Sequence, residues 1–293
     1  MPNQNIKGLK ILAYIVIIGY CICCLIPFLL IVSISFTDGE LIRQSTGYSL
    51  IPQKFSLEAY RVLLESPQMI VDAYRVNIIV TLFGTFFNVL LGVQYAYMLT
   101  RKSFRLKGAF SFILFFTMLF NGGMIPTYIL MTQYLHLRNN ILALILPYLV
   151  TPYNIFLVRS FMASIPDSLY EAAKIDGAGE YRILYTIFYP MSTGAIATVT
   201  VFAMLSFWNA WYPSMLYMDN ARDYSLQYML QNILAKAGEL KNATGLGMSA
   251  ENDVPEDTVR MATCVFAAGP LVVAFPFFQK YFVKGVAVGS VKG

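Results

Sequence analysis

The chain has 293 residues, of which 57% are hydrophobic and 13% are charged, and its mean hydropathy is +0.60. Soluble domains carry about 25% charged residues, so this chain has too few charges to cover a soluble globule. The composition excludes a soluble enzyme and a disordered chain, and it argues against a nucleic-acid-binding protein. It predicts an all-α membrane protein, because an open strand cannot satisfy its backbone groups in lipid.

Six stretches are long and apolar enough to cross a bilayer, which takes about 20 residues per helix. All six lack Asp, Glu, Lys and Arg. We expect one transmembrane domain over residues 1–293. Its predicted spans are residues 11–36, 76–99, 108–131, 141–158, 193–216 and 261–279.

The orientation follows from the distribution of Lys and Arg, which gather on the cytoplasmic side of membrane proteins. With a cytoplasmic amino terminus, the inner segments hold twelve of the 21 basic residues. The short loop after the second span is the clearest indicator, because Arg101, Lys102, Arg105 and Lys107 lie within seven positions. An even number of spans then places both termini in the cytoplasm.

Residues able to perform chemistry are sparse. The four cysteines lie in apolar runs, where cysteine usually acts as a small hydrophobe, and the single histidine, His136, lies in a short outer loop. No predicted span contains a carboxylate, which proton-coupled transport or intramembrane proteolysis would need. We therefore expect neither a catalytic residue nor a metal site in this chain.

The predicted cytoplasmic loop over residues 159–190 has helices of its own. Ser164 is a suitable N-cap residue, and Pro166 and Asp167 suit a first helical turn. The helix is expected to run to Ile175 and to stop at Gly177, since a left-handed position after a helix favours glycine. A second short helix is expected from about Glu180 to near Pro190.

One face of the first loop helix is small and flat. Leu169, Ala172, Ala173 and Asp176 share this face by helical spacing, and Glu171 and Asp176 offer charge to basic residues of a partner. Such a face suits docking of another protein better than catalysis.

The loop resembles the EAA loop of binding-protein-dependent ABC importer permeases. That pattern is Glu-Ala-Ala, three residues, Gly, nine residues, then Ile-x-Leu-Pro, and residues 171–190 match it except at Tyr189. Residues 165–166 and 175–178 resemble the carbohydrate branch, the MalG-like permeases. Residues 121–128, 280–285 and 291–293 resemble the LplC-like oligosaccharide permeases.

The resemblance implies a type I ABC importer permease in the cytoplasmic (inner) membrane of a bacterium. In this family the EAA helix docks in a cleft of an ATPase subunit and transmits ATP-driven closure to the membrane helices. The docking role is carried over to Glu171, Ala172, Ala173, Asp176, Gly177 and Pro190.

The resemblance also implies partners. They are a second permease, two ATPases that bind ATP and Mg²⁺, and an extracytoplasmic solute-binding protein. The chain itself contains no G-x-x-x-x-G-K-[ST] phosphate loop, so no cofactor is expected in it.

Uncharged polar residues inside the spans are candidates for the path of a hydroxylated solute. Amide and aromatic side chains suit sugars, but such amides also bond neighbouring helices, and Trp and Tyr also form interfacial belts. The candidates are Asn121, Asn154, Trp208, Asn209 and Trp211, with Asn88 and Gln94 as further amides.

The LplC-like resemblance implies an importer of oligosaccharides, such as alginate or pectin fragments, that works by alternating access. An ABC permease for a non-sugar solute is one alternative. A secondary carrier that needs no ATPase is the other.

Overall fold

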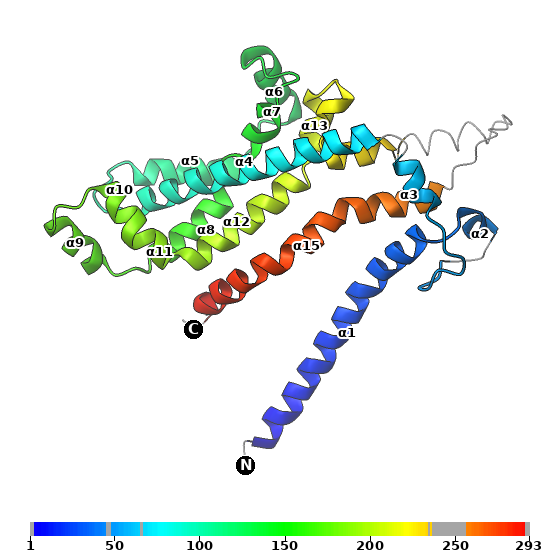
Figure 1. Ribbon diagram of the computed structural model, residues 1–293. Helices are drawn as coiled ribbons and strands as arrows, with labels where there is room; N and C mark the ends of the chain where they lie inside the picture. The colour runs from blue at the N-terminus through cyan, green and yellow to red at the C-terminus, as the bar shows by residue number, and fades with distance from the viewer. Residues whose placement is uncertain (1–2, 45–47, 65–66, 234, 236–255, 291–293) are drawn as a thin grey trace. The chain divides into compact units, whose positions relative to one another are not determined.

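The computed structural model describes residues 3–44, 48–64, 67–233, 235 and 256–290 (Figure 1). Regular structure in these residues is helical, apart from an isolated β-bridge between Thr37 and Phe55. Contacts divide the chain into two compact units. The first unit comprises residues 1–68 and 230–271, and the second comprises residues 69–229 and 272–293. Residues 291–293, which contribute to the family resemblance, lie outside the described residues.

The first unit begins with the apolar helix α1 (Asn3–Ser35). Every residue from 8 to 29 is exposed, which suits a helix that faces lipid or another subunit. At its end, Phe36 stacks on Phe55 and Tyr60 with ring centroids 5.6 and 4.9 Å apart. The other helices of this unit are α2 (Gly39–Gln44), α3 (Glu58–Leu63) and the first part of α15 (Glu256–Ser290).

The second unit is organised along α4 (Pro67–Thr100), a helix of 34 residues and therefore about 50 Å long. Its two halves contribute to two different core clusters. Val93 and Leu99 belong to a cluster with residues of α5 (Lys107–Leu119), α8 (Pro152–Met162), α12 (Thr193–Trp208) and the stretch 183–188. Val80 belongs to a cluster with Met131, near the start of η1 (Leu130–Tyr134), and with residues of α7 (Leu142–Ile145) and α13 (Tyr212–Tyr217).

The remaining elements of this unit are shorter. They are α5 (Lys107–Leu119), α6 (Met124–Ile129), η1 (Leu130–Tyr134), α7 (Leu142–Ile145), η2 (Leu146–Tyr148), α8 (Pro152–Met162), α9 (Asp167–Ile175), α10 (Glu180–Ile183), η3 (Leu184–Phe188), α11 (Tyr189–Met191), α12 (Thr193–Trp208), α13 (Tyr212–Tyr217) and η4 (Ala221–Asp223).

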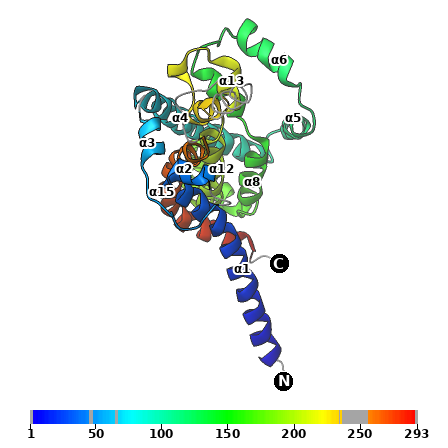
Figure 2. The ribbon, with the colours of Figure 1, turned by 90° about the vertical axis from the view of Figure 1, so that its right-hand side faces the viewer.

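The connecting elements of the second unit lie at its two ends. α9 and α10 lie at the left of Figure 1, beside the C-terminal end of α4, whereas α6, α7 and α13 lie away from them, toward the top. The turned view in Figure 2 again places α6 and α13 together near the top. The basic loop 101–107 follows the end of α4 near α9, so the two predicted cytoplasmic loops lie at one end.

The first two predicted spans form single helices that are long and apolar enough to cross a membrane. The prediction of one continuous helix over residues 108–131 is wrong. α5 ends at Leu119, and the axis of the segment Met124–Tyr134 is turned by 115° from it. Gly123 has φ +92°, a conformation that favours glycine, and the Asn121 Oδ1 atom accepts its N–H at 2.9 Å.

The predicted continuous helix over residues 141–158 is also broken. The segments Leu142–Tyr148 and Pro152–Met162 meet at 50°. Thr151 is extended, as expected before a proline, whose ring disfavours the helical conformation of the preceding residue. The break leaves carbonyl groups without helical partners in the middle of the unit.

The fifth predicted span, residues 193–216, starts as expected with α12 at Thr193 but stops at Trp208. α13 begins at Tyr212, with Pro213 in its first turn. Residues 209–211 therefore form a break and do not continue one face of a helix. The sixth predicted span, residues 261–279, lies within α15.

Candidate functional site

α9 has well-defined ends. Its N-cap residue is Pro166, and the Ser164 hydroxyl donates to the Phe161 carbonyl at 2.8 Å, so the predicted capping role of Ser164 is wrong. At the other end Gly177 has φ +74°, as predicted. The N–H groups of Gly177 and Ala178 donate to the carbonyls of Lys174 and Ala173, the pair of bonds that closes a Schellman motif.

The side chains of α9 divide into an inner and an outer face. Tyr170 and Ala173 are partly buried and pack against the core cluster of the second unit. Glu171, Ala172 and Asp176 are exposed. The predicted flat face is therefore split, because Ala173 packs inward.

The exposed face also carries apolar surface. The side chain of Ile175 is 86% exposed and that of Leu169 is 41% exposed. Single exposed apolar residues are common on protein surfaces, so these two residues alone do not identify a docking surface.

Glu180, the first residue of α10, connects α9 to α4. Its Oε2 accepts the Tyr97 hydroxyl at 2.6 Å, and its Oε1 accepts the Tyr170 hydroxyl at 2.9 Å and lies 2.8 Å from Lys174 Nζ. Partial burial raises the pKa of Glu180, but the bonds from Lys174, Tyr97 and Tyr170 outweigh it and leave this pKa below its usual value. The carboxylate is therefore ionised at neutral pH.

A second ion pair joins α9 to the basic loop after α4. Lys102 Nζ lies 2.5 Å from Asp167 Oδ2, and this hydrogen bond lowers the pKa of Asp167. Both side chains are substantially exposed, so the pair contributes little to stability.

The predicted solute-path residues are not gathered at one place. Asn154 and Trp208 are buried, whereas Asn121, Asn209 and Trp211 are exposed. The amides of Asn121 and Asn209 bond the backbone within four residues of themselves, which is a local structural role. Gln94, by contrast, lines a cavity of about 620 Å³ together with Tyr97, Arg101 and Glu180.

Two buried amides of α4 donate hydrogen bonds to backbone carbonyls at the breaks between other helices. Asn88 Nδ2 lies 2.8, 3.1 and 3.0 Å from the Tyr148 carbonyl, the Leu149 carbonyl and Thr151 Oγ1. Asn77 Nδ2 donates to the Trp208 carbonyl at 3.4 Å. Broken helices inside a membrane need such partners for their freed backbone groups, so α4 supplies hydrogen bonds at the breaks in the predicted fourth and fifth spans.

Replacing Asn88 with leucine is expected to lower the stability of the second unit by about 2 kcal/mol, because the partly buried carbonyls of Tyr148 and Leu149 each lose the hydrogen bond from this amide. Thermal unfolding of the purified protein in detergent measures this change. Gln94→Leu is the control, because among the described residues the Gln94 side chain bonds only the Tyr185 hydroxyl, at 3.3 Å. Equal melting temperatures for the two variants would contradict this role of Asn88.

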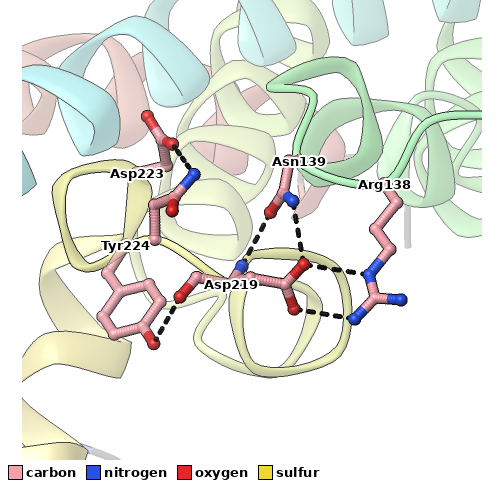
Figure 3. A network of polar contacts seen from close by, with 6 residues as sticks. Arg138, Asn139, Asp219, Asp223 and Tyr224 are labelled. Atoms are coloured by element: carbon pink, nitrogen blue, oxygen red, sulfur yellow. Dashed lines mark hydrogen bonds and ion pairs between the residues drawn. The ribbon is translucent and has the colours of Figure 1, made fainter.

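The opposite end of the second unit carries a polar network between two loops (Figure 3). Arg138 donates through Nε and Nη2 to the two carboxylate oxygens of Asp219, at 2.9 and 3.0 Å. Asn139 donates to Asp219 Oδ2 and accepts the Asp219 N–H at 2.8 and 2.7 Å. The bonds from Arg138 and Asn139 lower the pKa of Asp219. This network fixes the loop after η1 to the loop after α13 and leaves His136 exposed beside it.

The sequence motif located α9 and Gly177, but it did not identify Arg101, Tyr170 or Glu180 as site residues. In the sequence, Arg101 indicates only the orientation of the chain in the membrane. The contacts of these residues connect positions up to 87 apart in the chain. A motif made of closely spaced residues cannot reveal such long-range contacts.

Comparison with known proteins supports the motif. Residues 5–288 match a family described as binding-protein-dependent transport system inner membrane component. The chain belongs to this family. It is therefore a membrane permease subunit of an ABC importer, and such a permease works with an ATPase and a solute-binding protein.

Two relatives from Bacillus subtilis (strain 168) cover nearly the whole chain. The permease is 35% identical to the polygalacturonan/rhamnogalacturonan transport system permease protein YtcP, over 96% of this chain and 97% of that protein. It is 34% identical to protein LplC, over 92% of this chain and 90% of that protein.

A solved structure is also similar. It is the crystal structure of a bacterial ABC transporter involved in the import of the acidic polysaccharide alginate. The TM-score is 0.80 with 28% identity, over 96% of this permease and 99% of that chain. Family membership excludes the carrier without an ATPase, and the fold is that of a type I ABC importer permease.

Proposed function

We propose that this permease imports oligosaccharides released from acidic polysaccharides, as one of two permease subunits of its transporter. The support comes from two independent similarities. One relative carries polygalacturonan and rhamnogalacturonan in its name, and the similar solved structure belongs to a transporter of alginate. Both are polymers rich in uronic acids, so the shared chemistry is a hydroxylated chain that bears carboxylates.

The proposed topology has six spans with both termini in the cytoplasm. Among the described residues, two helices are long and apolar enough to cross a membrane, and three bent pairs raise the number to five. α15 contains the sixth predicted span. The basic loop 101–107 and α9 lie at the same end of the second unit, which supports a cytoplasmic side there.

In this proposal the outer face of α9 docks on an ATPase subunit, which binds ATP and Mg²⁺. The observation that carries it is the division of α9 into two faces. Tyr170 and Ala173 anchor the helix to the core, while Glu171, Ala172 and Asp176 are exposed. Gly177 ends the helix, and Pro190, which is exposed in α11, closes the docking loop.

The substrate class is tested in proteoliposomes that contain this permease with its companion permease, ATPases and binding protein. Galacturonate oligomers are expected to raise ATP hydrolysis by about tenfold or more, because the loaded binding protein favours the state that closes the ATPases. Neutral oligosaccharides of equal length and amino acids serve as controls. Stimulation by amino acids alone, or uptake without ATP, would refute the proposal.

A further inference from the structure

Arg101, the residue that follows α4, lies in a cage of three aromatic rings. Its side chain is a buried cation, since the residue is 7% exposed. The guanidinium carbon lies 4.8, 4.6 and 4.3 Å from the ring centroids of Tyr97, Tyr170 and Phe188. A cation within about 6 Å of a ring face is attracted by the ring quadrupole, and the attraction grows when water is excluded.

The three rings come from three different elements. Tyr97 belongs to α4, Tyr170 to the inner face of α9, and Phe188 to η3. The guanidinium thus joins the end of the longest helix of the second unit to both halves of the loop that follows α8. Its Nε and Nη2 also donate to the Thr100 hydroxyl at 3.2 and 3.0 Å, which fixes the plane of the guanidinium against α4.

The same two tyrosines make a second set of bonds. Tyr97 and Tyr170 each place a ring near Arg101 and donate a hydroxyl to Glu180. A displacement of α9 that breaks the ring contact therefore also breaks a charge-assisted hydrogen bond. Lys174, one turn after Tyr170, adds the ion pair to Glu180.

We infer that these residues form a clamp through which movement of α9 is transmitted to α4. The clamp consists of Arg101, Tyr97, Tyr170, Phe188 and Glu180. The inference rests on the proposed docking of α9 on the ATPase.

α4 is suited to pass the movement on. The breaks in the fourth and fifth spans are held by its Asn88 and Asn77 amides. A shift of α4 along its axis therefore moves the carbonyls at both breaks. The clamp also lines the 620 Å³ cavity through Tyr97, Arg101 and Glu180, so a movement of α9 changes the wall of this cavity as well.

The test compares variants of the complete transporter in proteoliposomes. Tyr170→Leu and Arg101→Met remove the stacking, whereas Tyr170→Phe keeps the ring and loses only the hydroxyl. Tyr134→Leu is the control, because Tyr134 is 74% exposed, lies in η1 outside the loop that follows α8, and does not line the 620 Å³ cavity. Three quantities are measured: the ATPase subunits that co-purify, the rate of ATP hydrolysis, and the sugar molecules imported per ATP hydrolysed.

We expect Tyr170→Leu and Arg101→Met to retain their ATPase subunits but to import about fivefold fewer sugar molecules per ATP, a typical size for coupling between sites. Tyr170→Phe is expected to lose less than about twofold, because a single hydrogen bond contributes modestly. Arg101→Lys keeps the charge without the planar stacking group, so its loss of import per ATP is expected to lie between about twofold and about fivefold. This variant keeps the test open if Tyr170→Leu and Arg101→Met do not fold.

Wild-type import per ATP in both Tyr170→Leu and Arg101→Met, or in Arg101→Lys where those two do not fold, would overturn the clamp. An equal loss in Tyr170→Phe and Tyr170→Leu would also overturn it, because the ring contact would then contribute nothing. Failure of the docking proposal gives a different result, since the ATPase subunits would then co-purify normally when Glu171 on the outer face is reversed in charge.

Discussion

Replacing Gly84 with alanine is expected to lower the stability of the second unit by about 3 kcal/mol, because overpacking a tight core costs roughly this much. A Cβ atom at Gly84 would lie 2.6, 2.7 and 2.8 Å from Cε1, Cζ and Cδ1 of Phe207. Phe207 is fully buried and packs edge-on against Tyr148, so its ring has little room to move. Thermal unfolding in detergent and the yield of folded protein measure the effect.

Gly92 provides the matched control on the same helix. A Cβ atom there would meet its nearest neighbour, Ile155 Cγ1, at 3.8 Å, which is ordinary van der Waals contact. Alanine is favoured over glycine in a helix interior by roughly 0.5–1 kcal/mol, so Gly92→Ala is expected to be neutral or slightly stabilising. Combining Gly84→Ala with Phe207→Leu is expected to recover part of the loss. Equal stability of Gly84→Ala and Gly92→Ala would contradict the close contact between Gly84 of α4 and Phe207 of α12.

Reversing the charge of Glu171 is expected to reduce both ATPase co-purification and sugar-stimulated ATP hydrolysis by about tenfold or more. An arginine at this exposed position would face the basic partner residues that a carboxylate attracts, and like charges across an interface cost several kcal/mol. Glu58→Arg is the control, because Glu58 is also exposed but lies in α3, on the side predicted to face away from the ATPase. Equal activity of the two variants would contradict the docking role.

Replacing Gly177 with alanine tests the same docking surface by straining the backbone at the end of α9. Nothing lies within 4 Å of a Cβ atom at Gly177 or at Gly179, but only Gly177 has a positive φ. Gly177→Ala therefore costs about 1 kcal/mol of backbone strain without a clash and is expected to loosen the end of α9. Gly179→Ala is expected to behave like the wild type.

The helical fold, the first two spans and the limits of α9 were predictable from the sequence. α1 and α4 are long apolar runs, and Gly177 with the Glu-Ala-Ala motif marks the end of α9. The breaks in the third, fourth and fifth spans were missed although local signals were present. Gly122-Gly123, Pro152 and Pro213 all disfavour a continuous helix, whereas the uncharged composition of each stretch favours one.

The clamp could not be predicted from the sequence. Arg101 meets Tyr170 and Phe188 only because α9 and η3 fold back against the end of α4. The role of Asn88 likewise depends on the break at residues 149–151, which frees the carbonyls that its amide satisfies. Such contacts follow from tertiary packing and leave no periodic signal in the chain.

A cysteine at Ala172 tests the account most directly, because this residue is small, exposed and central on the outer face of α9. The four native cysteines, Cys21, Cys23, Cys24 and Cys264, are first replaced with serine or alanine. In the assembled transporter, a bifunctional thiol reagent is expected to join Ala172→Cys to the ATPase subunit, with a yield that changes when ATP is added. Labelling of this cysteine by a lipid-soluble reagent, or by a water-soluble one equally well with and without the ATPase, would contradict the claim that α9 is the coupling helix.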